Sequence, residues 1–337
     1  MADKVVVITG ASAGVGRATA REFAKAGARL ALMARDAESL ERVKGEIGAL
    51  GVEALLLPLD VADANAVFSA ADRVERELGP ISVWVNDAML TVFSPVSQMT
   101  PEEFARVTNV TYLGYVYGTM AALRHMRRRN KGTIVQIGSA LAYRGIPLQA
   151  AYCGAKHAIR GFTDALRSEL LHEGSGIDLT MIQLPAVNTP QFDWARTHLS
   201  HKPRPVPPVI QPEAVARAVL KAVRKPRREY WLGLSTIKVI LGSMALPTFV
   251  DHYLARNGYE AQEQKALTSS GRRDNLFSPV TNLHRTRGSF GNEAHTAVTA
   301  VSGQAVRLTA FAAAAALLVS LGIAASRASA KAFGGRH

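Results

Sequence analysis

The stretch KVVVITGASAGVG, from Lys4 to Gly16, decides the fold of this chain. Its run of β-branched residues is typical of a strand that is buried on both faces, and the run ends at Gly10. Helical periodicity then begins near Gly14 and stops at Gly27. A buried strand that turns through glycines into a helix predicts the first unit of a parallel β-α-β fold.

Further short apolar runs alternate with longer helical patterns over the first 185 residues. The runs are ARLALMAR, EALLLPLDV, ISVWVN, GTIVQIGS and IDLTMIQLP, and helices are predicted near 63–79, 100–129 and 150–173. Asp36 is placed to cap the helix that follows the second strand. This alternation predicts an α/β fold with a doubly wound, Rossmann-like parallel sheet. Ligands of such sheets bind at the carboxyl ends of the strands.

The pattern changes after about residue 190, where a proline-rich loop and a less regular helical region follow. Composition predicts a main domain at 1–235, a helical extension near the substrate site at 236–267, a flexible linker at 268–304, an apolar helix at 305–327 and a basic tail at 328–337. The linker is predicted because TSSGRRDNLFSPVTNLHRTRGSFGNEAH, residues 268–296, is polar and glycine-rich.

Charge and cysteine content restrict the classes of protein to consider. Of the net charge of +13, residues 191–337 contribute +12, since they carry 20 basic and 8 acidic side chains. The basic region lacks the basic–aromatic interleaving of nucleic-acid readers, so we expect no nucleic-acid partner. One cysteine excludes an internal disulfide and fits a reducing compartment, and no metal-binding spacing appears. The apolar run at the N-terminus is too short for a signal peptide.

The glycine turn TGASAGVG predicts a dinucleotide site. Gly10 permits the tight turn, Gly14 lets the backbone approach a pyrophosphate, and Gly16 lets helix and strand pack closely. The N-terminus of the following helix supplies free N–H groups and a partial positive charge for the phosphates. A purely structural glycine turn is the alternative, and the position directly after the first strand argues against it.

The ends of the next two strands indicate which dinucleotide is bound. Arg35 stands where NAD sites usually carry a carboxylate, and an arginine there suits a 2′-phosphate. Arg17 could bracket the same phosphate, so NADP(H) is the predicted cofactor; the alternative is that both arginines are solvated surface residues. Asp60 could accept a hydrogen bond from the adenine amino group, or it could cap the next helix.

These motifs resemble the short-chain dehydrogenase/reductase family, in its TGxxxGxG branch, over about residues 4–235. The resemblance implies hydride transfer between a nicotinamide cofactor and a carbonyl/alcohol pair, with no metal. Its catalytic set would be Asn109 in TNVTYLG, Ser139 in IGSALAY, and Tyr152 with Lys156 in AAYCGAKHAI. The implied cofactor contacts are Gly10, Ser12, Gly14, Val15, Gly16, Arg17, Arg35, Asp60, Val61, Asn86, Ala88, Tyr152, Lys156, Val187 and Thr189.

The chemistry of the implied catalytic residues fits that reaction. Tyr152 would be the general acid in reduction and the base in oxidation, although a free phenol has a pKa of about 10. Lys156, four residues later on the same helix face, and an oxidised nicotinamide would both lower that pKa. Ser139 can hydrogen-bond a substrate carbonyl, and Asn109 would hold a water that passes the proton onward.

The fourth strand departs from the family pattern, because VNDAML carries Asp87 and Met89 where the pattern Asn-Asn-Ala-Gly has asparagine and glycine. Asn86 and Ala88 match. Met89 adds bulk beside the cofactor ribose and favours either a rearranged loop or weaker cofactor binding. A catalytically silent NADP-binding or membrane-associated scaffold protein is therefore the alternative to an enzyme.

Substrate and location are indicated less directly. The predicted pocket lining is apolar, which suits a hydrophobic ketone, aldehyde or alcohol; it comprises residues 90–93, residues 141–143, Phe192 and Trp194. The uncharged run at 308–325 rises only about 27 Å as a helix, so it is either a marginal membrane span or an alanine-rich packing helix. We expect a cytoplasmic catalytic domain with C-terminal membrane attachment, and the resemblance implies a homo-oligomer.

Overall fold

The computed structural model describes residues 1–334, and its centre is one mostly parallel sheet. Over these residues the strands of that sheet follow the order β3-β2-β1-β4-β6-β7-β12-β15, and only β15 is antiparallel to its neighbour. Their bounds are β1 Val5–Thr9, β2 Arg29–Ala34, β3 Ala54–Pro58, β4 Ile81–Asn86, β6 Gly132–Ile137, β7 Ile177–Gln183, β12 Glu229–Leu232 and β15 Ala300–Ser302. The predicted doubly wound α/β fold is confirmed.

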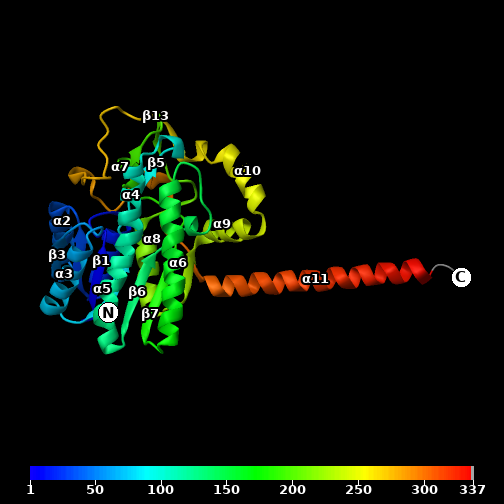
Figure 1. Ribbon diagram of the computed structural model, residues 1–337, viewed down its shortest axis with the longest axis horizontal. Helices are drawn as coiled ribbons and strands as arrows, with labels where there is room; N and C mark the ends of the chain where they lie inside the picture. The colour runs from blue at the N-terminus through cyan, green and yellow to red at the C-terminus, as the bar shows by residue number, and fades with distance from the viewer. Residues whose placement is uncertain (335–337) are drawn as a thin grey trace.

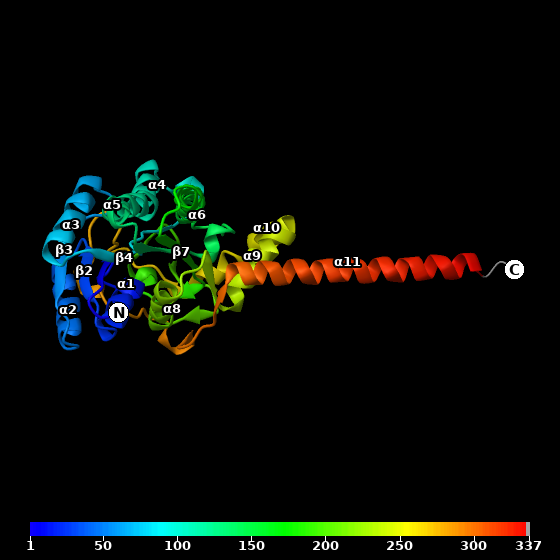
Figure 2. The same ribbon diagram turned by 90° about the horizontal axis from the view of Figure 1, so that it is seen from below.

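Helices cover both faces of the sheet, as Figure 2 shows. Strand β1 explains why, because Val6 and Ile8 pack into one apolar cluster while Val5 and Val7 pack into the other. The first cluster is covered by α1 Gly14–Lys25, α2 Ala37–Gly48 and α8 Pro212–Arg224. The second is covered by α3 Ala64–Glu77, α4 Pro101–Thr108, α5 Gly114–Arg129 and α6 Ala150–His172.

Local sequence signals set several helix boundaries. Asp36 caps α2 as predicted, accepting hydrogen bonds from the backbone N–H groups of Glu38 and Ser39. Thr100 begins α4 through a capping box with Glu103. The long helix predicted at 100–129 is interrupted by a π-helical turn at Asn109–Leu113, which separates α4 from α5.

Shorter elements gather at the carboxyl edge of the sheet, above the strand ends. They are β5 Val92–Phe93, β8 Ala186–Val187, α7 Gln191–Trp194, β9 Arg196–Thr197, β10 His201–Pro203, β11 Val209–Ile210, β13 Glu263–Leu267 and β14 Ala294–His295. The helical extension predicted at 236–267 contains α9 Gly233–Ala245 and α10 Pro247–Asn257, which are separated by a break before Pro247.

Residues 268–304 do not form the free linker that their composition predicts. Leu276 and Val280 are buried, and β15 pairs with β12 at the edge of the main sheet. The segment is therefore packed on the domain along much of its length. Arginine side chains bonded to its backbone carbonyls hold it there, as described below.

The chain ends in α11, Gly303–Gly334, which projects away from the body beside α9 (Figure 1). Its first turns are fixed to the sheet edge by Arg307, which pairs with Glu229 and donates to the Tyr143 hydroxyl at 2.8 Å. The guanidinium also lies 4.8 Å from the Trp231 ring centre. The last three residues of the basic tail predicted at 328–337 lie outside the described residues.

Candidate active site

A cavity of about 600 Å³ opens at the carboxyl ends of the parallel strands. It begins at the turn between β1 and α1, passes the ends of β2, β3 and β4, and reaches α6. The predicted site residues that line it are Gly10, Ser12, Gly14, Val15, Arg35, Asp60, Val61, Ala88, Ser139, Tyr152, Lys156, Val187 and Thr189. The position is the one that parallel α/β sheets use for ligands.

The glycine turn has the geometry that its sequence predicts. Gly10 and Gly14 have φ values of +71° and +55°, a conformation that side chains rarely adopt. A Cβ on Gly10 would lie 2.9 Å from the backbone of Ala88. Gly16 does not line the cavity; a Cβ there would overlap the Gly10 carbonyl, so this glycine allows α1 to pack closely on β1.

Ser139, Tyr152 and Lys156 meet at one end of the cavity, because β6 ends beside the first turns of α6. The Lys156 Nζ atom is buried; it donates to the Ile137 carbonyl at 2.7 Å and to the Tyr115 hydroxyl at 3.1 Å. It lies 5.6 Å from the centre of the Tyr152 ring. Tyr115 was not predicted from the sequence, and it helps to hold the ammonium against the end of β6.

Burial shifts the pKa values of the ionisable groups in this part of the cavity. It raises the pKa of Tyr152 well above the usual value, and a hydrogen bond with Ser139 opposes the shift. Burial also lowers the pKa of Lys156 and raises that of Asp87, while the attraction between these two opposite charges opposes both shifts. Burial therefore favours the protonated phenol of Tyr152 in the protein alone, whereas the predicted lowering of its pKa includes the positive charge of an oxidised nicotinamide. A protonated phenol suits proton donation to a carbonyl.

The prediction for Asn109 is wrong. This residue begins the π-helical turn, is exposed and does not line the cavity. Thr111, two residues later, is fully buried, and its hydroxyl donates to the Leu90 carbonyl and accepts from the Leu90 N–H, both at 2.9 Å. Thr111 therefore connects the π-helical turn to the loop after β4.

Two further predictions about strand ends have different outcomes: the one for Asn86 is wrong, and Asp60 lies at the cavity as predicted. Asn86 does not line the cavity, because its buried amide donates to Gln136 at 2.9 Å and accepts from Trp84 at 2.8 Å. Asp60 does line the cavity, and it pairs with Arg106. The alternative role of Asp60 as a helix cap is excluded, since Asp63 caps α3.

The two arginines predicted to hold a 2′-phosphate have different positions. Arg35 lines the cavity, whereas the buried Arg17 does not. Arg17 forms an ion pair with Glu46 and donates to the backbone carbonyl of His284 at 2.9 Å. Arg17 is therefore engaged within the protein and is not a free phosphate ligand.

The other end of the cavity is largely apolar. Leu90, Phe93, Leu141, Phe192 and Trp194 line it as predicted, and Met89 also contributes. Tyr143 does not line it and instead donates to Glu229 at 2.7 Å. The helical extension predicted to lie near the substrate site adds further apolar lining from α9 and α10, which consists of Val239, Val250, Tyr253 and Leu254.

Comparison with known proteins identifies the family. A sequence profile described as short chain dehydrogenase matches residues 4–199, which include the glycine turn, Ser139, Tyr152 and Lys156. The chain belongs to the short-chain dehydrogenase family. It is 30% identical over 284 residues to "Uncharacterized oxidoreductase YxnA" of Bacillus subtilis, a match that covers 84% of this chain and 80% of that protein. Mouse "Dehydrogenase/reductase SDR family member 7" is 39% identical over 174 residues, covering 50% and 52%.

Solved structures of this family give the same picture of the fold. An alcohol dehydrogenase of Thermococcus sibiricus complexed with 5-hydroxy-NADP is 29% identical with a TM-score of 0.58, covering 66% of this chain and 91% of that one. An NAD⁺-bound xylitol dehydrogenase is 31% identical with a TM-score of 0.53, covering 55% and 71%. The chain is thus an oxidoreductase of the short-chain dehydrogenase family, homologous to dehydrogenases that bind NAD or NADP.

Proposed function

We propose that this short-chain dehydrogenase uses NADP(H) to interconvert a hydrophobic ketone or aldehyde and its alcohol. The observation that carries the proposal is the meeting of Ser139, Tyr152 and Lys156 in the cavity that the glycine turn also lines. The cavity has the size of a ligand site, the glycine turn lines it at Gly10 and Gly14, and its far end is apolar.

The bound nicotinamide cofactor supplies or accepts the hydride, and the protein residues position the substrate and move the proton. Tyr152 gives its phenolic proton to the carbonyl oxygen in reduction. The Ser139 Oγ atom accepts from the Leu141 N–H at 3.1 Å and shares a hydrogen bond with Tyr152, so its O–H group can turn from Tyr152 to that same carbonyl oxygen. Lys156 holds the ribose hydroxyls with the ammonium N–H that remains after its bonds to Ile137 and Tyr115.

Arg35 supports a preference for NADP(H) over NAD(H). Its guanidinium lines the cavity at the end of β2 and makes three hydrogen bonds to backbone carbonyls, those of residues 275–277. Since a guanidinium carries five N–H donors, two remain for a 2′-phosphate. Charge-assisted hydrogen bonds are worth about 1.5–3 kcal/mol each.

We therefore expect NADPH to bind at least about tenfold more tightly than NADH. Fluorescence titration of the full-length protein with each nucleotide in the same buffer measures the two dissociation constants. Equal affinities, or tighter binding of NADH, would contradict the assignment of Arg35. A panel of hydrophobic ketones and aldehydes, followed by NADPH oxidation at about 340 nm, then tests the substrate class.

The C-terminal helix is proposed to attach the enzyme to a membrane, with the catalytic domain in the cytoplasm. Among the described residues, one helix is long and apolar enough to span a bilayer, and 6% of its Gly303–Ser320 window is buried in the protein. Basic side chains flank the apolar run, at Arg307 on one side and Arg327 and Lys331 on the other. Arg327 and Lys331 fit contact with lipid headgroups, whereas Arg307 is bound to Glu229 and Tyr143.

Flotation with liposomes tests this attachment. We expect the full-length chain to float and a variant ending at residue 310 to remain in the soluble fraction. The variant keeps β15 and Arg307, so its sheet edge is retained and any loss of flotation is due to the removed helix. Recovery of both proteins in the soluble fraction would contradict the membrane proposal. We also expect a homo-oligomer, because relatives commonly associate through helices equivalent to α5 and α6.

A further inference from the structure

A segment outside the part of the chain that matches the family profile lies across the proposed cofactor cavity. We call residues 272–290 the strap. Near its start, the Asn275 N–H donates to the Trp194 carbonyl at 3.0 Å, and the Leu276 side chain is fully buried in the apolar cluster that contains Val61 and Val110. Both valines line the cavity, and Val61 lies just after β3, so the strap is inserted at the end of the cavity that would hold the adenosine.

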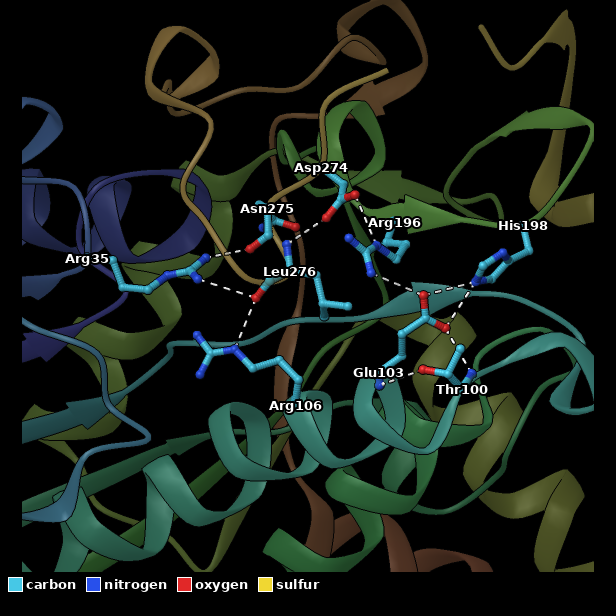
Figure 3. Close-up of polar contacts among 9 residues, drawn as sticks. All are labelled: Arg35, Thr100, Glu103, Arg106, Arg196, His198, Asp274, Asn275 and Leu276. Carbon is cyan, nitrogen blue, oxygen red and sulfur yellow. Dashed lines mark hydrogen bonds and ion pairs between the residues drawn. The ribbon is translucent and has the colours of Figure 1, made fainter. Parts of the chain in front are cut away.

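Donors from the cofactor side of the domain hold the strap by its backbone. Arg35 donates to the carbonyls of residues 275–277 at 2.5–3.3 Å, and Arg106 donates to the Leu276 carbonyl at 3.0 Å. Figure 3 shows the bonds that reach Asn275 and Leu276. Further along, Arg42 donates to the Thr281 carbonyl at 2.7 Å. Because the acceptors of these bonds are backbone carbonyls, the side chains of the strap do not predict them.

The strap also bonds directly to the glycine turn. The Gly14 N–H, at the N-terminus of α1, donates to the Arg285 carbonyl at 3.0 Å. The His284 ring lies 4.8 Å from the Trp194 ring, between centres, and its Nε2 atom is 3.4 Å from Asp36. The strap thus extends from the end of β2 to the turn that would hold the pyrophosphate.

The far end of the strap is fixed to the loop after β7. The Gly288 N–H donates to the Asn188 carbonyl at 3.0 Å, and the Phe290 N–H donates to the Asn188 side chain at 2.9 Å. A Cβ on Gly288 would overlap the carbonyl of Thr189, a residue of the cavity lining. Only glycine permits this close approach without displacement of the strap.

An ion-pair network connects the start of the strap to α4 and to β9, whose partner strand β5 contributes Phe93 to the apolar end of the cavity. Asp274 pairs with Arg196 at 3.0 Å, and Arg196 pairs at 3.3 Å with Glu103 on α4, which also binds His198 (Figure 3). Glu103 is buried, so this network is shielded from solvent better than a surface ion pair. The strap, α4 and β9 are therefore held together as one rim.

The strap covers the cavity without filling it. Asn275, Pro279 and His284 line the same cavity as Gly14 and Arg35, which face them from the cofactor side. We propose that the strap is a cofactor-binding element that closes over the adenosine half of the dinucleotide, so that the nucleotide enters and leaves only when the strap lifts. This inference rests on the proposed function, since it requires the cavity to bind NADP(H).

The release rate of NADPH tests the inference in the full-length protein. Gly288→Val should push the strap away from Thr189, whereas Gly291→Val is a matched control because no atom lies within 4 Å of a Cβ there. NADPH is bound, an excess of NADP⁺ is added, and the loss of NADPH fluorescence is followed by stopped flow. We expect at least about tenfold faster release from Gly288→Val and a wild-type rate from Gly291→Val.

A second pair of variants keeps the inference testable if Gly288→Val does not fold. Leu276→Asp places a carboxylate in the buried position, and Ser278→Asp adds the same charge at an exposed position of the strap. Circular dichroism and thermal melting are recorded for all four variants. Folded Gly288→Val and Leu276→Asp proteins that release NADPH at the wild-type rate would overturn the inference.

Three outcomes are decisive for the two proposals. Tighter NADPH binding by the folded strap variants would mean that the strap competes with the nucleotide, which contradicts closure over it. Wild-type protein that binds neither NADPH nor NADH would overturn the proposed function and, with it, the inference about the strap. Wild-type binding together with unchanged release from the variants would overturn only the inference about the strap.

Discussion

Replacement of Tyr152 by phenylalanine is expected to lower the turnover number for a hydrophobic ketone by at least about 100-fold, the usual scale of acid–base catalysis. The change removes one hydroxyl group and keeps the ring that lines the cavity beside Ser139. NADPH binding should therefore stay close to that of the wild type. Initial rates at saturating NADPH and a fluorescence titration measure the two properties separately.

Tyr117→Phe provides the control for that experiment, because Tyr117 lies on α5 and does not line the cavity. Its turnover number should equal that of the wild type. A Tyr152→Phe enzyme with near-normal turnover would show that another group donates the proton, and the catalytic assignment would then be wrong.

Lys156→Met is expected to lower turnover by a similar factor, about 100-fold, and to move the pH profile of alcohol oxidation to higher pH. A positive charge near a phenol favours the phenolate and so lowers the pKa of the phenol. Methionine keeps most of the side-chain volume and removes that charge, so the Tyr152 base form appears only at higher pH. The turnover number for the alcohol, measured from pH 6 to about 11 at saturating NADP⁺, gives the shift.

Tyr115→Phe separates the effect of the charge from that of the hydrogen bond. This variant loses the 3.1 Å bond to Lys156 and retains the ammonium and its 2.7 Å bond to the Ile137 carbonyl. We expect a small decrease in turnover and no alkaline shift. If Lys156→Met had the wild-type pH profile, Lys156 would not act on the ionisation of Tyr152.

Much of the fold could be predicted because it depends on local patterns. Successive side chains of β1 point alternately into the two apolar clusters, one on each face of the sheet. A strand that is buried on both faces therefore appears in the sequence as a continuous apolar run. Asp36 caps α2, which begins at the next residue, and Pro247 begins α10. Both residues therefore lie at the helix boundaries that they help to determine. Such signals are present in the sequence itself.

The errors at the site arise where orientation or distant contacts decide the outcome. Asn109 and Thr111 are two residues apart in a helical region, so their side chains point to nearly opposite sides, and a small error in register exchanges an exposed residue for a buried one. The strap was predicted to be a linker, although Arg35 and Arg106 bind its backbone carbonyls. Every residue type carries a backbone carbonyl, so these bonds leave no pattern in the sequence of the strap. Sequence periodicity reports apolar burial and cannot report contacts of this kind.

The attachment of α11 has a mechanical consequence. Arg307 joins the second turn of this helix to Glu229 and Tyr143, and β15, directly before the helix, is bonded to β12. Because the helix and the sheet edge share these bonds, the helix acts as a rigid lever and not as a flexible tether. If α11 stands in a bilayer, its tilt sets the angle between the cavity mouth and the membrane plane, and every molecule presents that mouth in the same direction.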